Sequence, residues 1–240
     1  MIPSLEDLLL LARLSSLEYT TDVDALAAGV NALGLGFVGQ VGNAERQALV
    51  ADWTARKRPV VIFQGTRVLE NTDLAEIGDD LDLHKMTAPN GAGFVHRGFF
   101  APVADIWPAI VRLLPADAAP IYAGHSLGGV SAHYGPAFRA GDAVSFGAPK
   151  GADAAYWASL YAAGGAPVRI VHEEDFAPGW SPALPWSTHP AGAIGWLHCG
   201  RLYRVERRTT WFNESLIDHS VDRYVAALAS LAERPSARAA

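Results

Sequence analysis

Four short runs of apolar, β-favouring residues alternate with longer stretches of helical periodicity, and this alternation constrains the fold more than any other feature. Short, largely apolar runs are typical of strands buried on both faces of a parallel sheet. The runs are Val60 to Phe63, Pro120 to Ala123, Ala143 to Phe146 and Val168 to Val171. The helical stretches, each long enough to cross over between parallel strands, are Phe99 to Leu114, Leu127 to Arg139 and Ala152 to Ala163. The sequence therefore predicts an α/β fold, with a mostly parallel central sheet and helices on both faces.

Further elements are expected towards the two ends of the chain. An N-cap pattern at Ser4 precedes apolar residues at helical spacing and predicts an N-terminal helix, and a second short helix is expected after Thr21. The prolines, glycines and tryptophans of residues 176–200 predict a long ordered loop. Arg201 to Glu206 alternates like an edge strand, and Asp218 to Ala232 has the periodicity of a closing helix.

The composition bounds the class of protein. The 240 residues suit one domain spanning 1–240, because α/β domains often exceed about 200 residues without splitting. Half of the residues are apolar and only 18% are charged, so the chain is expected to pack a sizeable core. The formal charge of −6, together with the lack of any basic run in the sequence, argues against a nucleic-acid partner.

The N-terminal region and the cysteine content bear on location. The apolar run Leu8 to Ala12 is far too short to span a bilayer and follows the acidic Glu6 and Asp7, so neither a transmembrane segment nor an export signal is expected. The lone Cys199 has no partner for an internal disulfide, which suits a reducing compartment. A cytoplasmic location is the default expectation, although a mature secreted form would have the same features.

The segment Gly124 to Gly128 matches the Gly-x-Ser-x-Gly pattern of a nucleophile elbow, in which a strand turns sharply into a helix and presents a serine hydroxyl. It lies where the patterns above end a buried strand at Ala123 and begin a helix at Leu127. The glycines suit the close backbone approach and the unusual dihedral angles of such a turn. Ser126 is thus predicted to be the nucleophile of an α/β-hydrolase fold. The alternative is that Ser126 only caps the following helix.

A serine hydroxyl becomes an effective nucleophile when a base removes its proton, and in this fold an acid and then a histidine follow the serine. The downstream carboxylates considered are Asp142, Asp153, Glu173, Glu174, Asp175 and Asp218. Asp175 comes just beyond the strand that ends near His172, at the carboxyl end of the sheet, where the active sites of such folds collect. It is the preferred acid, and Glu174 is its main rival.

The histidines in range of the serine are His133, His172, His189, His198 and His219. His219 stands at the start of the last helix, after a strand and a loop, which is where this fold delivers its base. It is the preferred base. His189, in the proline-rich loop, could reach the pocket, but for it and for His198 a structural or surface role is favoured. His125 and His96 are expected to be hydrogen-bonded packing residues.

Six segments, in this order, resemble the landmarks of the class 3 lipases, the fungal-lipase-like branch of the α/β hydrolases. They are Val60 to Thr66 (VVIFQGT), Val95 to Phe99 (VHRGF), Gly124 to Gly129 (GHSLGG), Ser145 to Pro149 (SFGAP), Val171 to Pro178 (VHEEDFAP) and Asp218 to Tyr224 (DHSVDRY). The resemblance implies Ser126, Asp175 and His219 as the catalytic triad. It also implies that Thr66 donates its backbone N–H to the oxyanion, together with the N–H of Leu127.

The oxyanion assignment also has a physical basis. Negative charge develops on the carbonyl oxygen as Ser126 attacks, and two preorganised N–H donors stabilise that charge more than they stabilise the neutral ester. Leu127 suits this role because the first N–H groups of a helix lack intrahelical partners and lie at the positive end of its dipole. For Thr66 the alternative is a β-turn residue with a satisfied hydroxyl.

Two positions depart from the family pattern. Gln64 stands where the family usually has Arg before the Gly-Thr pair. The lid-equivalent segment, about 67–82, has no aromatic residue and contains Glu70, Asp73, Glu76, Asp79, Asp80 and Asp82. A lid that opens onto an oil–water interface needs an exposed apolar face, which here only Val68, Leu69, Leu74, Ile77 and Leu81 could supply. This composition argues against interfacial activation, while a transient contact with a lipid interface stays compatible with it. The spacing of the carboxylates matches no Ca²⁺ loop, so no metal site is expected.

Together these features predict a serine carboxylic ester hydrolase, a lipase or esterase. It is expected to act on acylglycerols or simpler acyl esters through an acyl-enzyme intermediate and to need no cofactor. Candidates to line an acyl or aromatic pocket, with core packing as the alternative, are Trp180, Trp186, Trp196, Trp211 and Phe212. Two other functions stay open: an acyltransferase that uses the same triad to pass the acyl group to an alcohol, and a non-catalytic, lipase-like binding protein.

Overall fold

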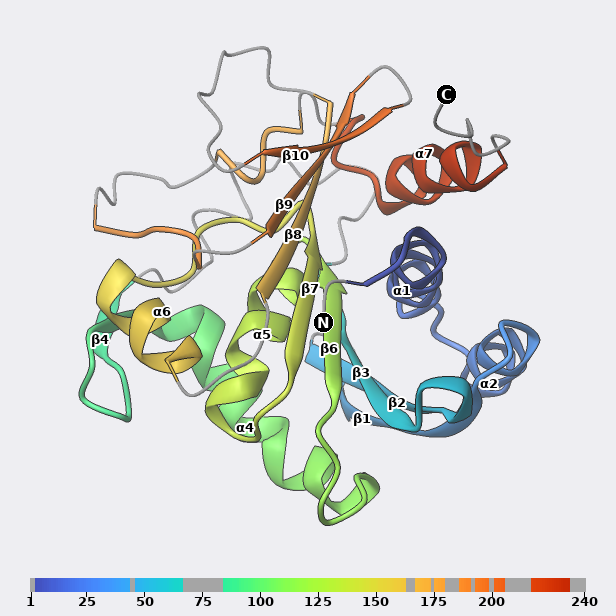
Figure 1. Cartoon of the computed structure of the whole chain (residues 1–240). Helices are drawn as coiled ribbons and strands as arrows, with labels where there is room; N and C mark the ends of the chain where they lie inside the picture. Colours follow the sequence, from blue (N-terminus) through green and yellow to red (C-terminus); the bar gives the residue numbers. More distant parts are fainter. Residues whose placement is uncertain are drawn as a thin grey trace.

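The structure is a computed structural model that describes residues 3–43, 46–66, 84–162, 167–173, 175–179, 186–190, 193–198, 201–205 and 217–233. Its central sheet has eight strands in the order β1-β2-β3-β6-β7-β8-β9-β10 (Figure 1). The strands are β1 (Gly36–Asn43), β2 (Arg46–Trp53), β3 (Arg58–Phe63), β6 (Ile121–His125), β7 (Asp142–Phe146), β8 (Pro167–His172), β9 (Ala193–His198) and β10 (Arg201–Val205). The pairs from β3 through β9 are parallel, whereas β1-β2, β2-β3 and β9-β10 are antiparallel. The predicted α/β fold with a mostly parallel sheet is therefore confirmed.

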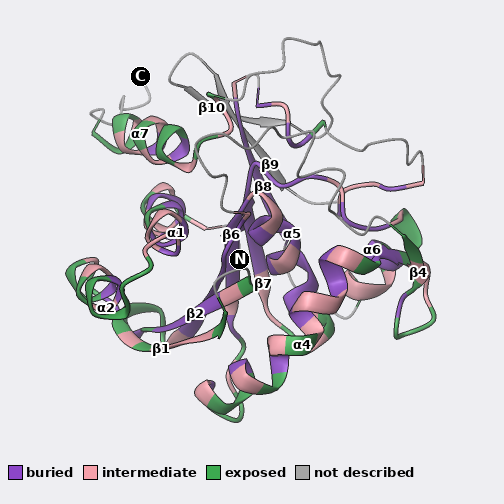
Figure 2. Ribbon diagram, turned by 180° about the vertical axis from the view of Figure 1, so that it is seen from behind, coloured by how far each residue is buried: buried purple, intermediate pink, exposed green. Residues whose placement is uncertain are grey.

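Helices cover both faces of the sheet, as predicted (Figures 1 and 2). On one face lie α1 (Leu5–Leu17), α2 (Val23–Ala32) and α7 (Val221–Ala232), and on the other lie α4 (Arg97–Leu113), α5 (Leu127–Tyr134) and α6 (Ala154–Tyr161). Alternate residues of β3 pack into the two layers. Val60 and Ile62 join the core with α1 and α7, whereas Val61 and Phe63 join the core with α4 and α5. The purple colour of the central strands in Figure 2 reflects this burial on both sides.

Local signals explain where several helices begin and end. The predicted capping box of α1 is present, because Ser4 Oγ accepts from the Asp7 N–H and the Asp7 carboxylate accepts from the Ser4 N–H. The side chain of Asp153 caps α6, so this helix begins two residues later than predicted. The helix predicted to run from Leu127 to Arg139 ends at Tyr134 and continues as the 3₁₀ turn η2 (Gly135–Ala137), because Pro136 has no N–H for the helical ladder.

The structure corrects the sequence prediction in two strand regions. The predicted loop of residues 176–200 contains β9, which pairs parallel to β8, so the loop prediction is wrong there. Backbone pairing of Gly195 with Ile170 needs no side chain, and this is why a glycine-containing segment can extend the sheet. Strands β1 and β2 had no predicted counterpart. The three glycines of β1, at 36, 39 and 42, weaken the strand pattern on which such a prediction depends.

Shorter elements complete the described chain, and some predicted features lie outside it. A two-stranded ribbon pairs β4 (Lys85–Thr87) with β5 (Phe94–His96), and η1 (Thr54–Arg56) precedes β3. Outside the described residues lie the predicted lid-equivalent segment 67–82, the rival acid Glu174, and Trp180, Trp211 and Phe212. Among the helices that the structure describes, none combines the length and the apolar character needed to cross a membrane.

Candidate active site

Ser126 occupies the sharp bend between β6 and α5. Its φ of 57° and ψ of −128° place a non-glycine residue in a region that L-residues rarely adopt, as a strained elbow requires. Its backbone N–H donates to the carbonyl of Phe146 on the neighbouring strand β7 at 2.9 Å. Within the described chain, the Ser126 hydroxyl makes no capping hydrogen bond to α5, so the alternative of a simple helix cap has no support.

The glycines on either side of Ser126 allow the backbone to pack more closely than any side chain would permit. A Cβ built on Gly124 would lie 2.3 Å from the carbonyl oxygen of Gly128. One built on Gly128 would lie 2.1 Å from the carbonyl oxygen of Phe63, at the end of β3. The elbow is therefore pressed against the end of a neighbouring strand, and glycine is required at both positions.

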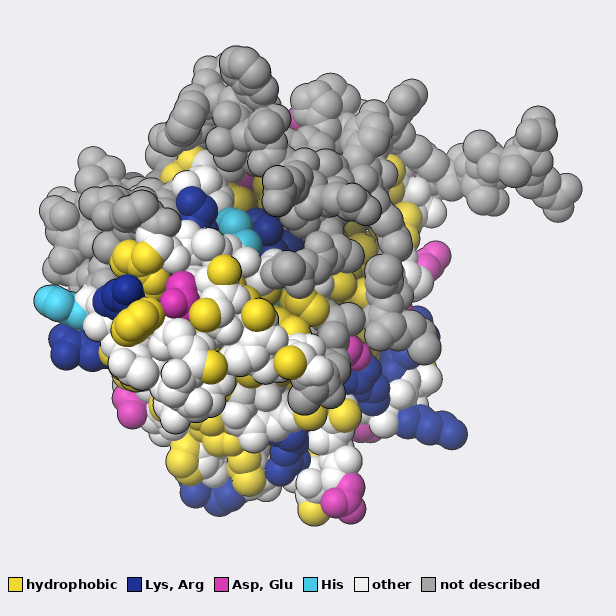
Figure 3. Space-filling view, turned by 60° about the vertical axis from the view of Figure 1, so that its left-hand side comes forward, with side chains coloured by type: hydrophobic (Ala, Val, Ile, Leu, Met, Phe, Trp, Pro, Cys, Tyr) yellow, Lys and Arg dark blue, Asp and Glu magenta, His cyan; other side chains and the backbone are white. Residues whose placement is uncertain are grey.

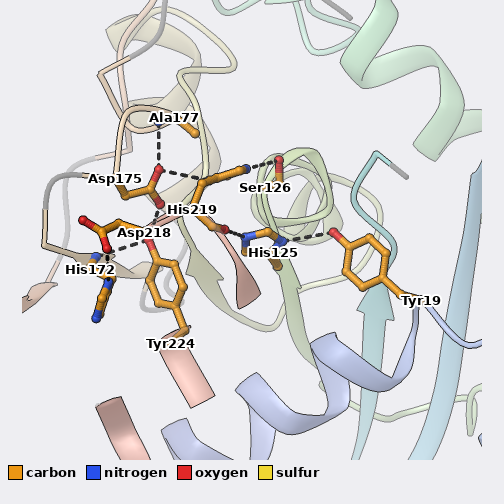
Figure 4. A network of polar contacts seen from close by, with 9 residues as sticks. All are labelled: Tyr19, His125, Ser126, His172, Asp175, Ala177, Asp218, His219 and Tyr224. Carbon is orange, nitrogen blue, oxygen red and sulfur yellow. Dashed lines mark hydrogen bonds and ion pairs between the residues drawn. The ribbon is translucent and has the colours of Figure 1, made fainter. Parts of the chain in front are cut away.

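His219 lies in the turn before α7 and reaches Ser126 with one nitrogen and Asp175 with the other (Figure 4). The distance from His219 Nε2 to Ser126 Oγ is 2.9 Å, and the distance from His219 Nδ1 to Asp175 Oδ1 is 3.0 Å. An ionised carboxylate only accepts, so the Nδ1–H donates to Asp175 and leaves Nε2 free to accept the Ser126 hydroxyl proton. The structure thus brings together the three residues selected from the sequence.

Asp175 is buried at 3% exposure, just beyond β8, and several donors hold its carboxylate. Its Oδ1 also accepts from the backbone N–H of Ala177 at 2.9 Å, and its Oδ2 accepts from the hydroxyl of Tyr224 on α7. Burial, and then the negative charge of Asp175, raise the pKa of Tyr224 well above its ordinary value. The phenol therefore stays a neutral donor at physiological pH, and it helps to satisfy a carboxylate that is shielded from water.

Gly147, in the segment SFGAP, makes room for this acid. It has a φ of +60°, and a Cβ built on it would lie 2.5 Å from Asp175 Oδ2 and 2.9 Å from the Tyr224 hydroxyl. Sequence reasoning did not assign a role to Gly147 or Tyr224, although both belong to segments that resemble the class 3 lipases. Their place in those segments was the available signal.

Three of the other carboxylate candidates have different surroundings from Asp175. Asp142 Oδ2 accepts from Arg58 Nη1 at 2.6 Å, and Asp153 caps α6. Asp218 Oδ1 lies 3.9 Å from Nδ1 of His172, next to the site but not in contact with Ser126. These positions leave Asp175 as the described carboxylate that meets His219 Nδ1.

Two of the other histidine candidates have side chains in hydrogen bonds away from the triad. His133 is buried between the hydroxyls of Ser145, at 2.9 Å, and Tyr161, at 3.2 Å, and burial lowers its pKa to about 3. His189 Nε2 lies 2.8 Å from the carbonyl oxygen of Pro178. His198 is the last residue of β9, where its backbone pairs with that of Arg201. The side-chain contacts of His133 and His189 do not place either imidazole at Ser126.

The two histidines expected to be packing residues do form hydrogen bonds. His96 Nε2 lies 3.0 Å from Ser187 Oγ, and its ring is 4.6 Å from that of Trp186. Trp186 is partly exposed and packs beside the β4-β5 ribbon, and its predicted role in a pocket or in packing stays a prediction. His125 contacts Tyr19 and the backbone of His219, which that prediction did not anticipate.

The two residues predicted to form the oxyanion hole lie on segments that meet at the elbow. Leu127 is the first residue of α5. Thr66 follows Gly65, whose Cβ, if present, would lie 3.3 Å from Ser126 Cβ and 2.6 Å from the carbonyl oxygen of His125. This close approach sets the end of the β3 turn against the nucleophile. The donor roles of the two N–H groups stay predictions.

Gln64, which stands where the class 3 lipases usually have Arg, is buried. Its backbone N–H donates to the carbonyl of Gln47 at 3.0 Å, and its amide Nε2 donates to the carbonyl of Glu18 at 2.9 Å. Gln64 therefore connects the strand that leads to Thr66 with the end of α1. The residue that follows Glu18 is Tyr19, whose hydroxyl meets His125.

Comparisons with known proteins agree with this fold. No family model matches the sequence, and a comparison with curated protein sequences found no match. A Rhizomucor miehei triacylglyceride lipase superposes with a TM-score of 0.66 at 20% identity, over 79% of this chain and 78% of that one. A triacylglycerol lipase described as having a serine protease triad as its catalytic centre gives 0.66 at 20% identity, over 80% of each chain. A Penicillium expansum triacylglycerol lipase gives 0.59 at 23% identity, over 79% and 78%. The chain has the α/β-hydrolase fold of these lipases, as the sequence resemblance predicted.

Proposed function

We propose that this chain, which has the fold of fungal triacylglycerol lipases, hydrolyses carboxylic esters through a covalent acyl-enzyme. One observation carries the proposal. A continuous set of hydrogen bonds runs from the hydroxyl of Ser126 through both nitrogens of His219 to the buried carboxylate of Asp175. Acyl transfer by a serine requires this order of nucleophile, base and orienting acid.

In the acylation half-reaction, Ser126 Oγ attacks the ester carbonyl carbon as His219 Nε2 takes the hydroxyl proton. The carbonyl π electrons move to oxygen, and the N–H groups of Thr66 and Leu127 stabilise the resulting oxyanion. Collapse of the tetrahedral intermediate breaks the bond to the alkoxy oxygen, which leaves as an alcohol with the proton from His219. Ser126 then carries the acyl group.

In the deacylation half-reaction, water replaces the alcohol. His219 Nε2 takes a proton from water as its oxygen attacks the acyl carbon, and the same two N–H groups stabilise the second oxyanion. Collapse returns the proton to Ser126 Oγ and releases the carboxylic acid. Throughout, Asp175 keeps the Nδ1–H of His219 in place and stabilises the imidazolium that forms twice per turnover. The protein groups, the ester and water together account for every bond and every proton transfer in the two half-reactions.

Acylglycerols or simpler acyl esters are the proposed substrate class, with transient contact at a lipid interface. On the face drawn in Figure 3, hydrophobic side chains lie in small groups with Lys and Arg among them. Ile217, two residues before His219, is 64% exposed beside the site and is a candidate for such a contact. A comparison of emulsified and dissolved esters of the same acyl chain tests this part of the proposal.

The proposal is tested by substituting Ser126→Ala and measuring the turnover of p-nitrophenyl esters from acetate to palmitate. Ser131→Ala is the matched control, because its hydroxyl lies on the same helix and donates to the carbonyl of Leu127 at 3.2 Å without touching the triad. We expect Ser126→Ala to reduce kcat by at least about 10³-fold and Ser131→Ala to change it little. Retention of most turnover by folded Ser126→Ala contradicts the nucleophile assignment.

Product analysis with a competing alcohol separates hydrolysis from acyl transfer to that alcohol. We expect the free acid to be the main product in water with a modest amount of added alcohol. Predominant formation of the new ester under the same conditions favours the acyltransferase alternative over the hydrolase.

A further inference from the structure

We infer that His125 is a positioning residue that, together with Tyr19, fixes the backbone of His219 so that its imidazole meets Ser126. The inference rests on the proposed function, because it assigns a role within the same site. It is supported by two hydrogen bonds of the His125 side chain, one to the hydroxyl of Tyr19 and one to the backbone carbonyl of His219 (Figure 4).

The directions of these two hydrogen bonds follow from chemistry. His125 Nε2 lies 2.5 Å from the backbone carbonyl oxygen of His219, and a carbonyl oxygen only accepts, so Nε2 carries the proton. In the neutral ring Nδ1 is then an acceptor. It lies 3.0 Å from the hydroxyl of Tyr19, which therefore donates to it. The phenol thus selects the tautomer of His125 that can hold the carbonyl of His219.

His125 is also held neutral. Burial, and then the charge of His219, lower the pKa of His125 well below its ordinary value. The two imidazole rings are 4.7 Å apart, so a protonated His125 would oppose the positive charge that His219 gains in each half-reaction. A neutral donor positions the base without adding this repulsion.

The arrangement ties base and nucleophile to one short piece of backbone. His125 is the last residue of β6, and Ser126 follows it directly. The backbone of His219 is bonded to residue 125 while its side chain is bonded to residue 126. Displacement of His219 relative to the elbow therefore has to break its hydrogen bond to His125 as well as the contact with Ser126.

Tyr19 is itself anchored from two sides. It follows Glu18, the C-cap residue of α1, whose carbonyl accepts from the side-chain amides of Gln64 at 2.9 Å and Gln47 at 3.4 Å. Its hydroxyl reaches His125 over Gly65, where an added Cβ would lie 2.3 Å from the phenolic oxygen. The end of the N-terminal helix thus supports a base 200 positions later in the chain.

The experiment compares kcat and KM for a soluble p-nitrophenyl ester in Tyr19→Phe, His125→Leu, His125→Gln and the double variant Tyr19→Phe/His125→Leu. Tyr161→Phe is the matched control, because it removes another tyrosine–histidine hydrogen bond, to His133, away from the triad. Thermal unfolding of every variant accompanies the kinetics.

We expect Tyr19→Phe to lower kcat about three- to tenfold and His125→Leu about 10²-fold, with KM little changed, because only the geometry of proton transfer is affected. His125→Gln retains an N–H near the position of Nε2 and should recover part of kcat. The double variant should match His125→Leu, since Tyr19 acts only through His125. Tyr161→Phe should leave kcat unchanged.

Equal effects of Tyr19→Phe and Tyr161→Phe on kcat would overturn the inference, as would additive effects in the double variant. Tyr19→Phe alone decides the matter if the His125 variants do not fold. If Ser126→Ala abolishes turnover while folded Tyr19→Phe keeps the full kcat, only the positioning role fails. If Ser126→Ala remains active, the proposed function itself fails.

Discussion

The hydroxyl of Tyr224, on the last helix, donates to the same carboxylate of Asp175 that orients His219. The acid therefore receives charge-stabilising hydrogen bonds on both oxygens, from a phenol on Oδ2 and from the backbone of Ala177 on Oδ1. The backbone N–H of His172 in turn donates to the Tyr224 hydroxyl at 3.2 Å. This connection makes α7 part of the support of the acid as well as of the base.

Tyr224→Phe is expected to lower kcat about tenfold and to reduce the free energy of unfolding by roughly 1–3 kcal/mol, because it leaves one carboxylate oxygen buried without its donor. Tyr156→Phe is the control. The Tyr156 hydroxyl is also buried, but among the described residues it has no hydrogen-bond partner. Its removal should therefore leave kcat and the free energy of unfolding unchanged. Steady-state kinetics and urea unfolding measure the difference. Equal losses in the two variants would show that the bond to Asp175 has no special role.

Gly147→Ala is expected to abolish most activity, because the new methyl group would collide with Asp175 Oδ2 at a backbone angle that already disfavours a side chain. Gly34→Ala and Gly91→Ala are matched controls, with φ of +82° and +72° and nothing within 4 Å of the added Cβ. Each control substitution should lower the free energy of unfolding by about 1 kcal/mol, because of backbone strain alone, and should leave kcat unchanged. An active Gly147→Ala enzyme contradicts the packing described around the acid.

Asp175→Asn is expected to lower kcat by about three to four orders of magnitude with the fold intact, because an amide can hold His219 in the wrong tautomer and cannot balance an imidazolium. Glu174→Gln provides the comparison, since Glu174 was the rival acid in the sequence. It should retain most of the turnover. The assignment of the acid reverses if Glu174→Gln is the inactive variant and Asp175→Asn the active one.

Stability is expected to fall as the pH drops below about 6.5, in part through His133. Its pKa is about 3 in the folded protein and about 6.5 when unfolded, so between these values the unfolded chain binds the extra proton. This contribution to the free energy of unfolding is fully present above a pH of about 6.5. It is lost as the pH falls towards about 3, at up to about 1.4 kcal/mol per pH unit.

Urea unfolding from pH 7.5 to pH 4 tests this pH dependence. His133→Asn should show a shallower decline of the unfolding free energy with falling pH than the unmodified protein. An identical slope in His133→Asn would mean that His133 does not carry this dependence.

Much of the fold could be predicted because the parallel strands are buried on both faces and therefore appear as short, largely apolar runs, such as Val60 to Phe63. The carboxyl ends of parallel strands meet at one edge, so residues following β6 and β8 could be expected to converge even though they are far apart in the sequence. This reasoning selected Ser126 and Asp175. His219 was selected by its place before the closing helix.

Other parts of the site have no local signature. Tyr19 lies 106 positions from His125, and nothing in its neighbourhood distinguishes it from a tyrosine at the end of any helix. The partner of Tyr224 likewise depends on how α7 docks, which a sequence pattern does not specify. Strands β1 and β9 were missed because their glycines obscure the strand pattern, while the backbone pairing that forms them does not depend on side chains.

The activation of Ser126 by His219 is tested most directly by the rate of covalent modification with a fluorophosphonate at neutral pH, followed by intact mass and peptide mapping. We expect one adduct per chain, on the peptide containing Ser126, with a rate at least about 10²-fold lower in folded His219→Asn. Absence of the adduct, an adduct on another residue, or an unchanged rate in His219→Asn would contradict this expectation.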